Sequence, residues 1–390
     1  MSQPLHVVHL LYRFAAGGLE NVLVQLINGL PRGEFRHSLV ALTEIDSAFV
    51  ARIERDDVRI VTLHKPPGQP FKLYPRVYRL LRELQPDVVH SCNIAALEFM
   101  PVATAAGVPL RVHAEHGWDV ADPDGSNRKY QALRRLYRRF VHAFIAVSPQ
   151  LQDYLRDKVR ISASRLHFIP NGVDTNHYRP ASIEDTGPAD FPFRRNEHIV
   201  IGTVGRLEPI KNQTLLVAAF IELARSNHPL AARLRLVVVG DGPERGGLSN
   251  SLQAVNLVER AWLPGSRPDV AEILKALDLF VLPSLAEGTS CTLQEAMATN
   301  LPIIATDVGG NADLLEQGRF GTLVRSNDVA ALVDAIRIWL DTQYGNDKAS
   351  EDAGDETKRQ WVERHYSRQH MLNEYAAIFS SRKLRHEGGV

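Results

Sequence analysis

Short apolar runs alternate with longer amphipathic stretches along the chain, and this alternation constrains the fold more than any other feature. Between the first two runs, apolar side chains recur at Leu19, Leu23, Leu26, Ile27 and Leu30, the 3.6-residue spacing of a helix face. Strands and helices in turn predict a parallel sheet with helices on both faces. The strands expected in the first half are Val7–Leu11, Ser38–Leu42, Val58–Leu63, Asp87–Ser91, Arg111–Glu115, His142–Ser148 and Leu166–Pro170.

The pattern pauses in a stretch with Pro180, Gly187, Pro188 and Pro192 and little periodicity, which is typical of a linker. It then restarts. The expected strands are Ile199–Val204, Leu234–Val239, Leu279–Leu282 and Pro302–Thr306, and the expected helices are Asn212–Arg225, Asp269–Ala276 and Thr292–Thr299. Two similar α/β halves predict two doubly wound, Rossmann-like domains that face each other across a cleft. Such sheets bind ligands beyond the carboxyl ends of their strands.

Composition narrows the function classes. Hydrophobic residues make up 44% of the chain, as in a globular protein. Lys plus Arg and Asp plus Glu each number 45, so nothing global favours nucleic acid binding. Cys92 and Cys291 stand too far apart for a zinc motif or a disulfide framework. The sequence shows no signal peptide and no membrane-spanning stretch, so we expect a cytoplasmic protein, at most attached to the inner face of the plasma membrane.

Two glutamates, Glu287 and Glu295, follow the expected strand Leu279–Leu282 and flank a run of small residues. Small residues suit a tight turn into a helix, and a helix N-terminus offers backbone N–H groups to an anion. One carboxylate could accept hydrogen bonds from sugar hydroxyls and the other from a ribose diol. Glu295 has an alternative role, because Thr292 and Glu295 also match a capping box, which would only stabilise the helix start.

Arg206 and Lys211 follow Gly205 at the carboxyl end of the strand Ile199–Val204. A guanidinium fork and an ammonium group at this place could neutralise a diphosphate. The alternative is two solvated loop cations with no role in binding.

In the first half, Gly17-Gly18 opens the first helix, where paired glycines allow a phosphate or sugar to approach the backbone or simply make a tight turn. His116 ends the strand Arg111–Glu115 and could hydrogen-bond a sugar, although a lone histidine is more often structural. Strand alternation points His113 and His116 in different directions. Their spacing is not that of a helical zinc pair, so we assign no metal.

Two other segments have competing interpretations. Gly240-Asp241-Gly242-Pro243 nearly matches a dinucleotide fingerprint, but the third glycine, Gly246, comes one residue late and Pro243 stands where the helix should begin. The stretch 128–140, which includes Arg134 and Arg135, interleaves basic and apolar residues. It suits the surface of an anionic membrane, but the simpler interpretation is an amphipathic helix that packs on its own domain.

Taken in order, these segments resemble the family-4 retaining glycosyltransferases of the GT-B fold, and the similarity covers nearly the whole chain. It also resembles the branch associated with bacterial exopolysaccharide and exosortase gene clusters. The resemblance implies an acceptor-binding domain over 1–180, a linker over 181–196, a nucleotide-sugar-binding domain over 197–362, and a C-terminal helix in 363–390 that packs back on the first domain. The segments that carry it are Gly17-Gly18-Leu19-Glu20, His116-Gly117, Val147-Ser148, Pro170-Asn171-Gly172-Val173-Asp174, Gly205-Arg206 with Lys211-Asn212, Gly240-Asp241-Gly242-Pro243, and Glu287 to Glu295.

The resemblance assigns roles to these residues. Arg206 and Lys211 would bind the donor diphosphate, Glu295 the ribose, and Glu287 the reacting face of the donor sugar. His116 would hydrogen-bond that sugar near the transferred carbon, so His116, Glu287, Arg206 and Lys211 would serve catalysis. Ser290 stands where the family commonly has glycine or proline, which leaves the phosphate contacts there open. Donor contacts made largely by the backbone are expected at Gly17, Gly18, Gly205, Leu263, Gly288, Thr289, Ser290, Cys291 and Thr292.

The implied reaction moves a sugar from a nucleotide-diphosphate sugar to a lipid-linked or polysaccharide acceptor, with retention and without a metal cofactor. Charge that grows on the leaving phosphate would be stabilised by the two cations and the helix N-terminus. Three alternatives remain: a nucleotide-sugar epimerase on the same fold, a non-catalytic nucleotide-sugar-binding subunit, and a dehydrogenase. The sequence does not identify the donor base, the sugar, the acceptor or the oligomeric state.

Overall fold

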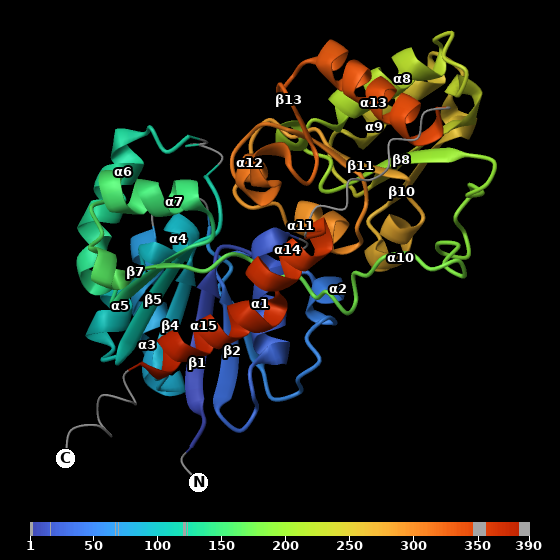
Figure 1. Ribbon diagram of the computed structural model, residues 1–390. Helices are drawn as coiled ribbons and strands as arrows, with labels where there is room; N and C mark the ends of the chain where they lie inside the picture. The colour runs from blue at the N-terminus through green and yellow to red at the C-terminus, as the bar shows by residue number, and fades with distance from the viewer. Residues whose placement is uncertain are drawn as a thin grey trace. The chain divides into compact units, whose positions relative to one another are not determined.

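The computed structural model describes residues 3–15, 17–66, 68, 70–119, 122, 124–345 and 356–381. The chain forms two compact units. Unit 1 comprises Met1–Gly172 and Arg368–Val390, and unit 2 comprises Val173–Ser367. Each unit is built on a parallel sheet flanked by helices, which confirms the Rossmann-like α/β fold predicted from the alternation (Figure 1). Within the described ranges, no helix is both long and apolar enough to cross a membrane.

The sheet of unit 1 has seven strands in the order β3-β2-β1-β4-β5-β6-β7, so β1 lies near its centre. Its strands are β1 (Leu5–Leu11), β2 (Phe35–Ala41), β3 (Arg59–Thr62), β4 (Val88–Cys92), β5 (Leu110–Glu115), β6 (Ala143–Ala146) and β7 (Leu166–Phe168). Its helices are α1 (Gly18–Gly29), α2 (Ser47–Val50), α3 (Tyr74–Leu84), α4 (Asn93–Leu97), α5 (Met100–Ala105), α6 (Arg128–Tyr137), α7 (Pro149–Asp153) and α15 (Arg368–Ser380).

Side-chain alternation along the strands divides the core of unit 1 into two layers. Val8 and Leu10 of β1 face α3 to α7, whereas Val7 and Leu11 face α1 and α15. The C-terminal helix α15 therefore returns to the first unit and packs beside α1, as the resemblance implied (Figure 1). Residues 382–390, which belong to the expected tail, lie outside the described residues.

The sheet of unit 2 has six strands in the order β10-β9-β8-β11-β12-β13. They are β8 (Ile199–Val204), β9 (Leu234–Val239), β10 (Ala261–Gly265), β11 (Leu279–Leu282), β12 (Ile303–Thr306) and β13 (Thr322–Val324). The helices are α8 (Gln213–Ala224), α9 (Arg245–Gln253), α10 (Val270–Lys275), α11 (Cys291–Ala298), α12 (Asn311–Leu314), α13 (Val329–Tyr344) and α14 (Lys358–His365). The two edge strands, β10 and β13, were not predicted, because β13 is only three residues long and β10 contains a proline and a register shift.

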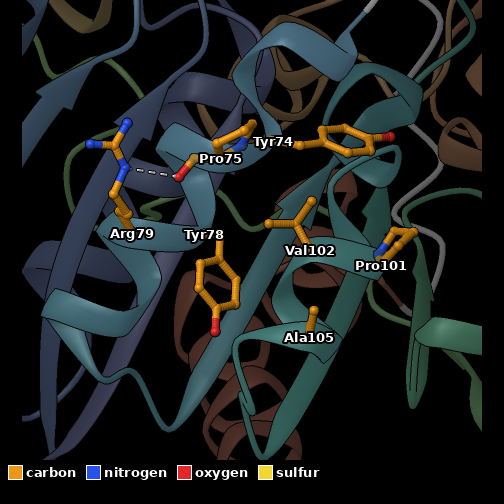
Figure 2. A pocket seen from close by; sticks show the side chains of 7 residues that line it. All are labelled: Tyr74, Pro75, Tyr78, Arg79, Pro101, Val102 and Ala105. Carbon is orange, nitrogen blue, oxygen red and sulfur yellow. Dashed lines mark hydrogen bonds between the residues drawn. The ribbon is translucent and has the colours of Figure 1, made fainter.

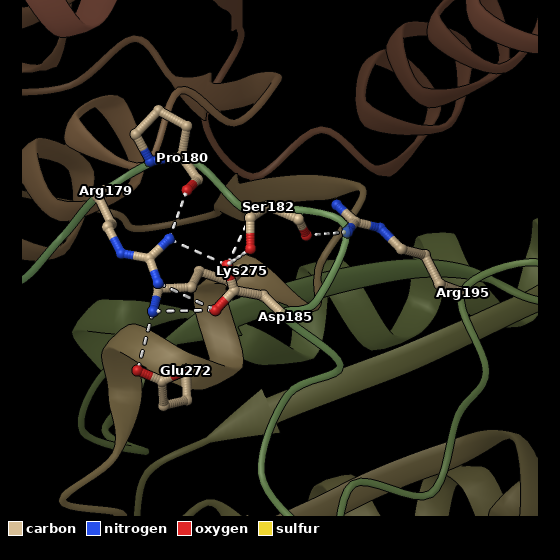
Figure 3. Close-up of polar contacts among 7 residues, drawn as sticks. All are labelled: Arg179, Pro180, Ser182, Asp185, Arg195, Glu272 and Lys275. Atoms are coloured by element: carbon tan, nitrogen blue, oxygen red, sulfur yellow. Dashed lines mark hydrogen bonds and ion pairs between the residues drawn. The ribbon is translucent and has the colours of Figure 1, made fainter.

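The segment 181–196, which we expected as a linker, lies in unit 2, and polar contacts attach it to α10 (Figure 3). Asp185 accepts hydrogen bonds from the backbone N–H and hydroxyl of Ser182, both at 2.7 Å, and pairs with Arg179 at 3.0 Å. Lys275 of α10, whose side chain is 4% exposed, reaches Asp185 at 3.4 Å and Glu272 at 2.9 Å. The chain passes between the units at Gly172/Val173 and Ser367/Arg368 instead.

Candidate active site

At the carboxyl end of the unit 2 sheet, Lys211 and Glu287 form an ion pair although they are distant in sequence. The Lys211 ammonium donates to both carboxylate oxygens of Glu287, at 2.7 and 2.8 Å. Ser284 donates a third hydrogen bond to this carboxylate at 2.6 Å, and the Glu287 side chain is only 6% exposed. An ammonium has three donors, so Lys211 retains one that can point at an anionic ligand.

Adjacent strands bring this pair together, since β8 and β11 are neighbours and the loops that follow them meet at one edge. The backbone N–H of Leu285 donates to the carbonyl of Ile210 at 2.8 Å and joins the two loops directly. A third loop, which contains Gly309, packs against the loop of Glu287. Gly309 has φ +54°, and a Cβ at this position would overlap the carbonyl oxygen of Glu287.

Helix α11 begins beside this pair. The hydroxyl of Ser290 accepts from the backbone N–H of Leu293 at 3.3 Å, so Ser290 is the N-cap and Cys291 the first helical residue. The alternative in which Thr292 and Glu295 form a capping box is therefore wrong, because the helix starts before Thr292. Glu295 lies one turn into the helix with Cys291 and Thr292 on its partly exposed face. The carboxylate is thus placed on a face that a ligand can reach.

Arg206 lies in the loop after β8, where its guanidinium pairs with Glu208 at 2.7 Å and its side chain is 42% exposed. This loop is packed against the Gly240–Pro243 turn. Gly240 and Gly242 have φ +139° and +153°. A Cβ on Gly240 would overlap the carbonyl oxygen of Gly205, and a Cβ on Gly242 would overlap that of Leu207, both in the Arg206 loop. These two glycines are thus required by loop packing, which removes the main reason to interpret the turn as a dinucleotide fingerprint.

Leu263 lies in the edge strand β10. Its carbonyl accepts a hydrogen bond from Arg245 at 3.1 Å, and the N–H of Gly240 donates to the carbonyl of Gly265 at 2.9 Å. The backbone around Leu263 is consequently held in place, as a pocket lined by main-chain groups requires.

The site residues predicted in unit 1 also gather at the carboxyl ends of strands. Gly17 is the N-cap of α1, and Gly18 is the first helical residue. A pocket of about 290 Å³ opens beside them, lined by residues at or after the ends of β1, β4 and β5, among them Arg13, Cys92 and Gly117, and by Glu20 of α1. Arg13 and Cys92 could not be predicted as wall residues of this pocket, because neither belongs to a motif.

His116 directly follows β5 and points to the same side of the sheet as His90, whereas His113 lies on the other side against Phe144. The backbone N–H of His116 donates to the side-chain oxygen of Asn93 at 2.8 Å. Both ring nitrogens are buried, and neither has a hydrogen-bond partner of normal geometry among the described residues. Burial lowers the pKa of His116 to about 4, although nearby Glu115 and Asn171 oppose the fall, so the imidazole is neutral at pH 7.

A buried ion pair joins β5 to α6. Arg134 donates to both oxygens of Glu115, at 2.6 and 3.2 Å, and the two side chains are 4% and 1% exposed. Burial alone would raise the pKa of Glu115, but Arg134 and His113 outweigh it and hold this pKa at about 2. No feature of the sequence distinguishes Arg134 from Arg135 and Arg139, which are exposed, so the pair could not be predicted.

The stretch 128–140 forms α6 and a short 3-10 turn, and its apolar side packs on its own unit. Tyr137 is buried in the core, while Leu133 and Phe140 pack against it. Interpreting Arg134 as part of a membrane-facing surface was wrong, since it points inward to Glu115. The outer face carries the exposed residues Arg128, Lys129, Arg135, Leu136 and Arg139.

An apolar groove of about 450 Å³ lies between α3 and α5 (Figure 2). Tyr74, Tyr78, Pro101 and Val102 line it, and Arg79 stands at its side with its guanidinium bonded to the carbonyl of Pro75 at 3.3 Å. None of the site residues predicted from the sequence belongs to it.

Comparison with known proteins identifies the family. Residues 198–342 match the family model described as glycosyl transferases group 1, and residues 16–177 match glycosyltransferase family 4. The chain belongs to this family of glycosyltransferases. It is a nucleotide-sugar-dependent enzyme, and the predicted family, reaction class and donor class are confirmed.

Individual relatives are more distant. The chain is 29% identical over 343 residues to the UDP-Gal:alpha-D-GlcNAc-diphosphoundecaprenol alpha-1,3-galactosyltransferase of Escherichia coli, with 85% of this chain and 87% of the relative covered. It is 25% identical over 349 residues to the putative glycosyltransferase EpsF of Bacillus subtilis, with 87% of each covered. The chain superposes on the crystal structure of Anabaena HepE in complex with UDP and glucose with a TM-score of 0.77 and 20% sequence identity. The match covers 96% of this chain and 99% of HepE. This likeness confirms the GT-B fold.

Proposed function

We propose that this glycosyltransferase transfers a sugar from a UDP-sugar to a lipid-linked acceptor in cell-surface or exopolysaccharide biosynthesis, with retention of the anomeric configuration. The observation that carries the donor half of the proposal is the Lys211–Glu287 pair beside the start of α11. The E. coli relative is named for UDP-galactose and a diphosphoundecaprenol acceptor, and HepE was crystallised with UDP and glucose. These names support uracil as the donor base and a lipid diphosphate as the acceptor class.

In this proposal the leaving diphosphate lies against Lys211, Arg206 and the N-terminal turn of α11. Negative charge grows on the leaving phosphate while the sugar becomes oxocarbenium-like. A fixed ammonium, a guanidinium and a helix N-terminus stabilise that charge without reorganising during the reaction. Arg206 must exchange part of its bond to Glu208 for the phosphate, which its 42% exposure permits.

Glu287 has two functions in this arrangement. Its carboxylate holds Lys211 in position, and its oxygens remain acceptors for hydroxyl groups of the donor sugar. Glu295 would accept hydrogen bonds from the ribose. Backbone groups of Gly205 and of Gly288, Thr289, Ser290, Cys291 and Thr292 would approach the phosphates, and those near Leu263 the base.

In unit 1, His116 and the Gly17-Gly18 backbone would contact the donor sugar. A neutral imidazole can donate one hydrogen bond and accept another, which suits sugar hydroxyls. With a pKa of about 4, His116 stays neutral at pH 7 and adds no positive charge near an oxocarbenium-like sugar. Its role is to position the sugar.

The apolar groove between α3 and α5 fits the acceptor's isoprenoid chain, because it is open, lined by aromatic and aliphatic side chains, and flanked by Arg79. The exposed face of α6 and of the turn that follows it supports a peripheral contact with an anionic membrane, since Leu136 is exposed there together with the four cations named above. Charge reversal of Arg135 and Arg139 is expected to weaken binding to anionic liposomes, and reversal of the unit 2 residue Arg337 is not. Equal binding by both variants would remove the membrane proposal.

The deciding experiment combines ligand binding and transfer. UDP at about 100 times its Kd should stabilise the wild type by about 2.7 kcal/mol, and GDP, ADP and TDP should do so less. Transfer is then measured from UDP-sugars to an undecaprenyl-diphosphate-linked sugar, with the free sugar as the control. A stronger effect of another nucleotide would overturn the donor base, and equal transfer to the free sugar would overturn the lipid acceptor.

The epimerase alternative is tested in the same assay. Incubation of donor without acceptor should give only slow hydrolysis. Accumulation of a new sugar nucleotide under these conditions would contradict the proposed transfer.

A further inference from the structure

A row of polar side chains, all buried except the partly exposed His116, crosses the core of unit 1 beneath α1 and α15. Its members, His37, His9, His90 and His116, come from β2, β1, β4 and the end of β5 and all face the same side of the sheet. His9 Nε2 lies 3.0 Å from His37 Nδ1, and His9 Nδ1 lies 3.0 Å from His90 Nδ1. Cys92 lies beside this row, with its Sγ 3.9 Å from Nε2 and 4.0 Å from Nδ1 of His90.

Several polar groups around Cys92 are buried and unsatisfied. Among the described residues, neither nitrogen of the His116 ring has a partner of normal geometry, and the hydroxyl of Tyr375 has none. Tyr375 packs edge-on against His90, with the two ring centroids 5.5 Å apart. A buried polar group without a partner costs about 1–3 kcal/mol, so several at one place call for a ligand.

We propose that His90, Cys92 and His116 bind a zinc ion, with the Tyr375 hydroxyl or a fourth ligand from the adjoining pocket completing a tetrahedron. One donor atom from each of the three residues lies within 4.8 Å of the other two. Zinc bonds of roughly 2.0–2.3 Å place such atoms about 3.5 Å apart, so the three ligand atoms must move closer together when the ion binds. Imidazole and thiolate ligands select zinc over the oxygen-preferring magnesium and calcium ions.

Two further features of the structure favour this site. His9 contacts His90 through Nδ1, which leaves Nε2 as the ligand atom of His90, and such an orienting partner accompanies most metal-binding histidines. Cys92 also lines the 290 Å³ pocket at the carboxyl edge of the sheet, which gives an ion a path to the buried ligands.

Zinc at this position would regulate the enzyme, and this part of the inference rests on the proposed function. A His116 nitrogen that coordinates zinc cannot contact the donor sugar. Zinc is therefore an inhibitor that acts through unit 1, and binding itself does not require the donor.

The test uses the full chain and Co²⁺ as a spectroscopic probe, followed by displacement with Zn²⁺. The wild type should develop a thiolate-to-cobalt charge-transfer band that Zn²⁺ abolishes. Cys92→Ala should lose the band, whereas Cys291→Ser, which removes the other cysteine, should retain it. His116→Gln removes a ligand, so it should weaken Zn²⁺ binding by more than the roughly 10–100-fold that loss of an orienting partner causes. This variant tests the site if Cys92→Ala does not fold.

The absence of the band in the folded wild type, or its persistence in folded Cys92→Ala, would overturn the zinc site. In the activity assay, Zn²⁺ should inhibit the wild type at the concentration that displaces Co²⁺, and Cys92→Ala should resist it. Inhibition that is equal in both proteins would overturn the regulatory role. Because the band is measured without donor or acceptor, failure of the proposed transfer reaction leaves the binding result interpretable.

Discussion

β1 and β8 hold the same place in their sheets, each in the interior between two parallel neighbours, but their side chains differ. β8 reads Ile-Val-Ile-Gly-Thr-Val and is buried throughout, with Thr203 as its one hydroxyl. β1 is almost as buried but contains His6 and His9. Unit 2 thus confines its chemistry to loops beyond an apolar sheet. Unit 1 carries ionisable groups into its core, and each of these groups needs a partner there.

Substitutions in the two units should therefore have different effects on function and stability. In unit 2, the glycines at 240, 242 and 309 let loops approach one another closely, and Arg206, Lys211 and Glu287 lie in the loops that they approach. Changes there should affect donor binding more than folding. In unit 1, the Arg134–Glu115 pair and the histidine row belong to the core itself, so the same changes that affect the site should affect stability.

The largest effect is expected from Lys211→Met. Loss of the ammonium removes a fixed charge from the leaving phosphate and should lower kcat by about 10³-fold, equivalent to about 4 kcal/mol. Steady-state kinetics measure this, with Arg337→Met on the outer face of α13 as the matched loss of a cation and Lys211→Arg as the conservative change. Unchanged kcat in a folded Lys211→Met protein would contradict the diphosphate role.

Arg134→Met should have the next largest effect, on stability. It leaves the Glu115 carboxylate buried without its cation, which costs about 3–5 kcal/mol. Hydrogen exchange should show faster opening of unit 1 while unit 2 keeps its protection. The neighbouring Arg135→Met, which removes an exposed arginine, should leave both units unchanged, and similar results for the two variants would show that the buried pair is unimportant.

Acidification to pH 5 should destabilise unit 1 selectively. Burial lowers the pKa of His37 to about 3 and that of His116 to about 4, and it also lowers those of His9 and His90. The unfolded chain therefore binds more protons below pH 6.5, and stability falls as the pH falls from about 6.5 towards 4. At pH 5 each such histidine costs about 2 kcal/mol, although coupled groups do not add.

The pH experiment separates the histidines from Glu115. Because the pKa of Glu115 is held at about 2, its contribution is lost only between pH 4.5 and 2. Hydrogen exchange at pH 7 and pH 5, corrected for the intrinsic rate, should show the loss in β1, β2 and β4 and not in β8. Equal loss in both sheets would contradict the contrast between them.

Gly309→Ala is expected to act through Glu287. The new Cβ would overlap the Glu287 carbonyl, and φ +54° is strained for alanine, so the Glu287 loop must shift at a cost of about 1–3 kcal/mol. The donor KM should rise at least tenfold while unit 1 stays as stable as before. Gly318→Ala, which also replaces a glycine of positive φ but meets no atom within 4 Å, separates loop displacement from backbone strain.

The smallest effect is expected for Glu295→Ala, which should raise the donor KM about tenfold through the loss of ribose hydrogen bonds, about 1.4 kcal/mol. Since Ser290 caps α11, stability should hardly change. Glu222→Ala on the exposed side of α8 is the control. A fall in stability without a change in KM would return Glu295 to a structural role.

The sequence by itself determined the spacing of apolar residues in each segment, which distinguishes helices from strands, and the order of the motifs. Apolar spacing in α1 and in strands such as Ile199–Val204 is local, so it predicted two parallel sheets and placed Arg206, Lys211, Glu287 and Glu295 just beyond strand ends. It could not decide which residues meet.

Lys211 reaches Glu287 only because β8 and β11 are neighbours, and Arg134 is buried only because α6 packs its Arg134 side on Glu115. The histidine row likewise depends on register, which sets His9 of β1 directly opposite His90 of β4. Period is a property of neighbouring residues, whereas strand order, register and burial depend on segments far apart in the chain, and these only the tertiary structure decided.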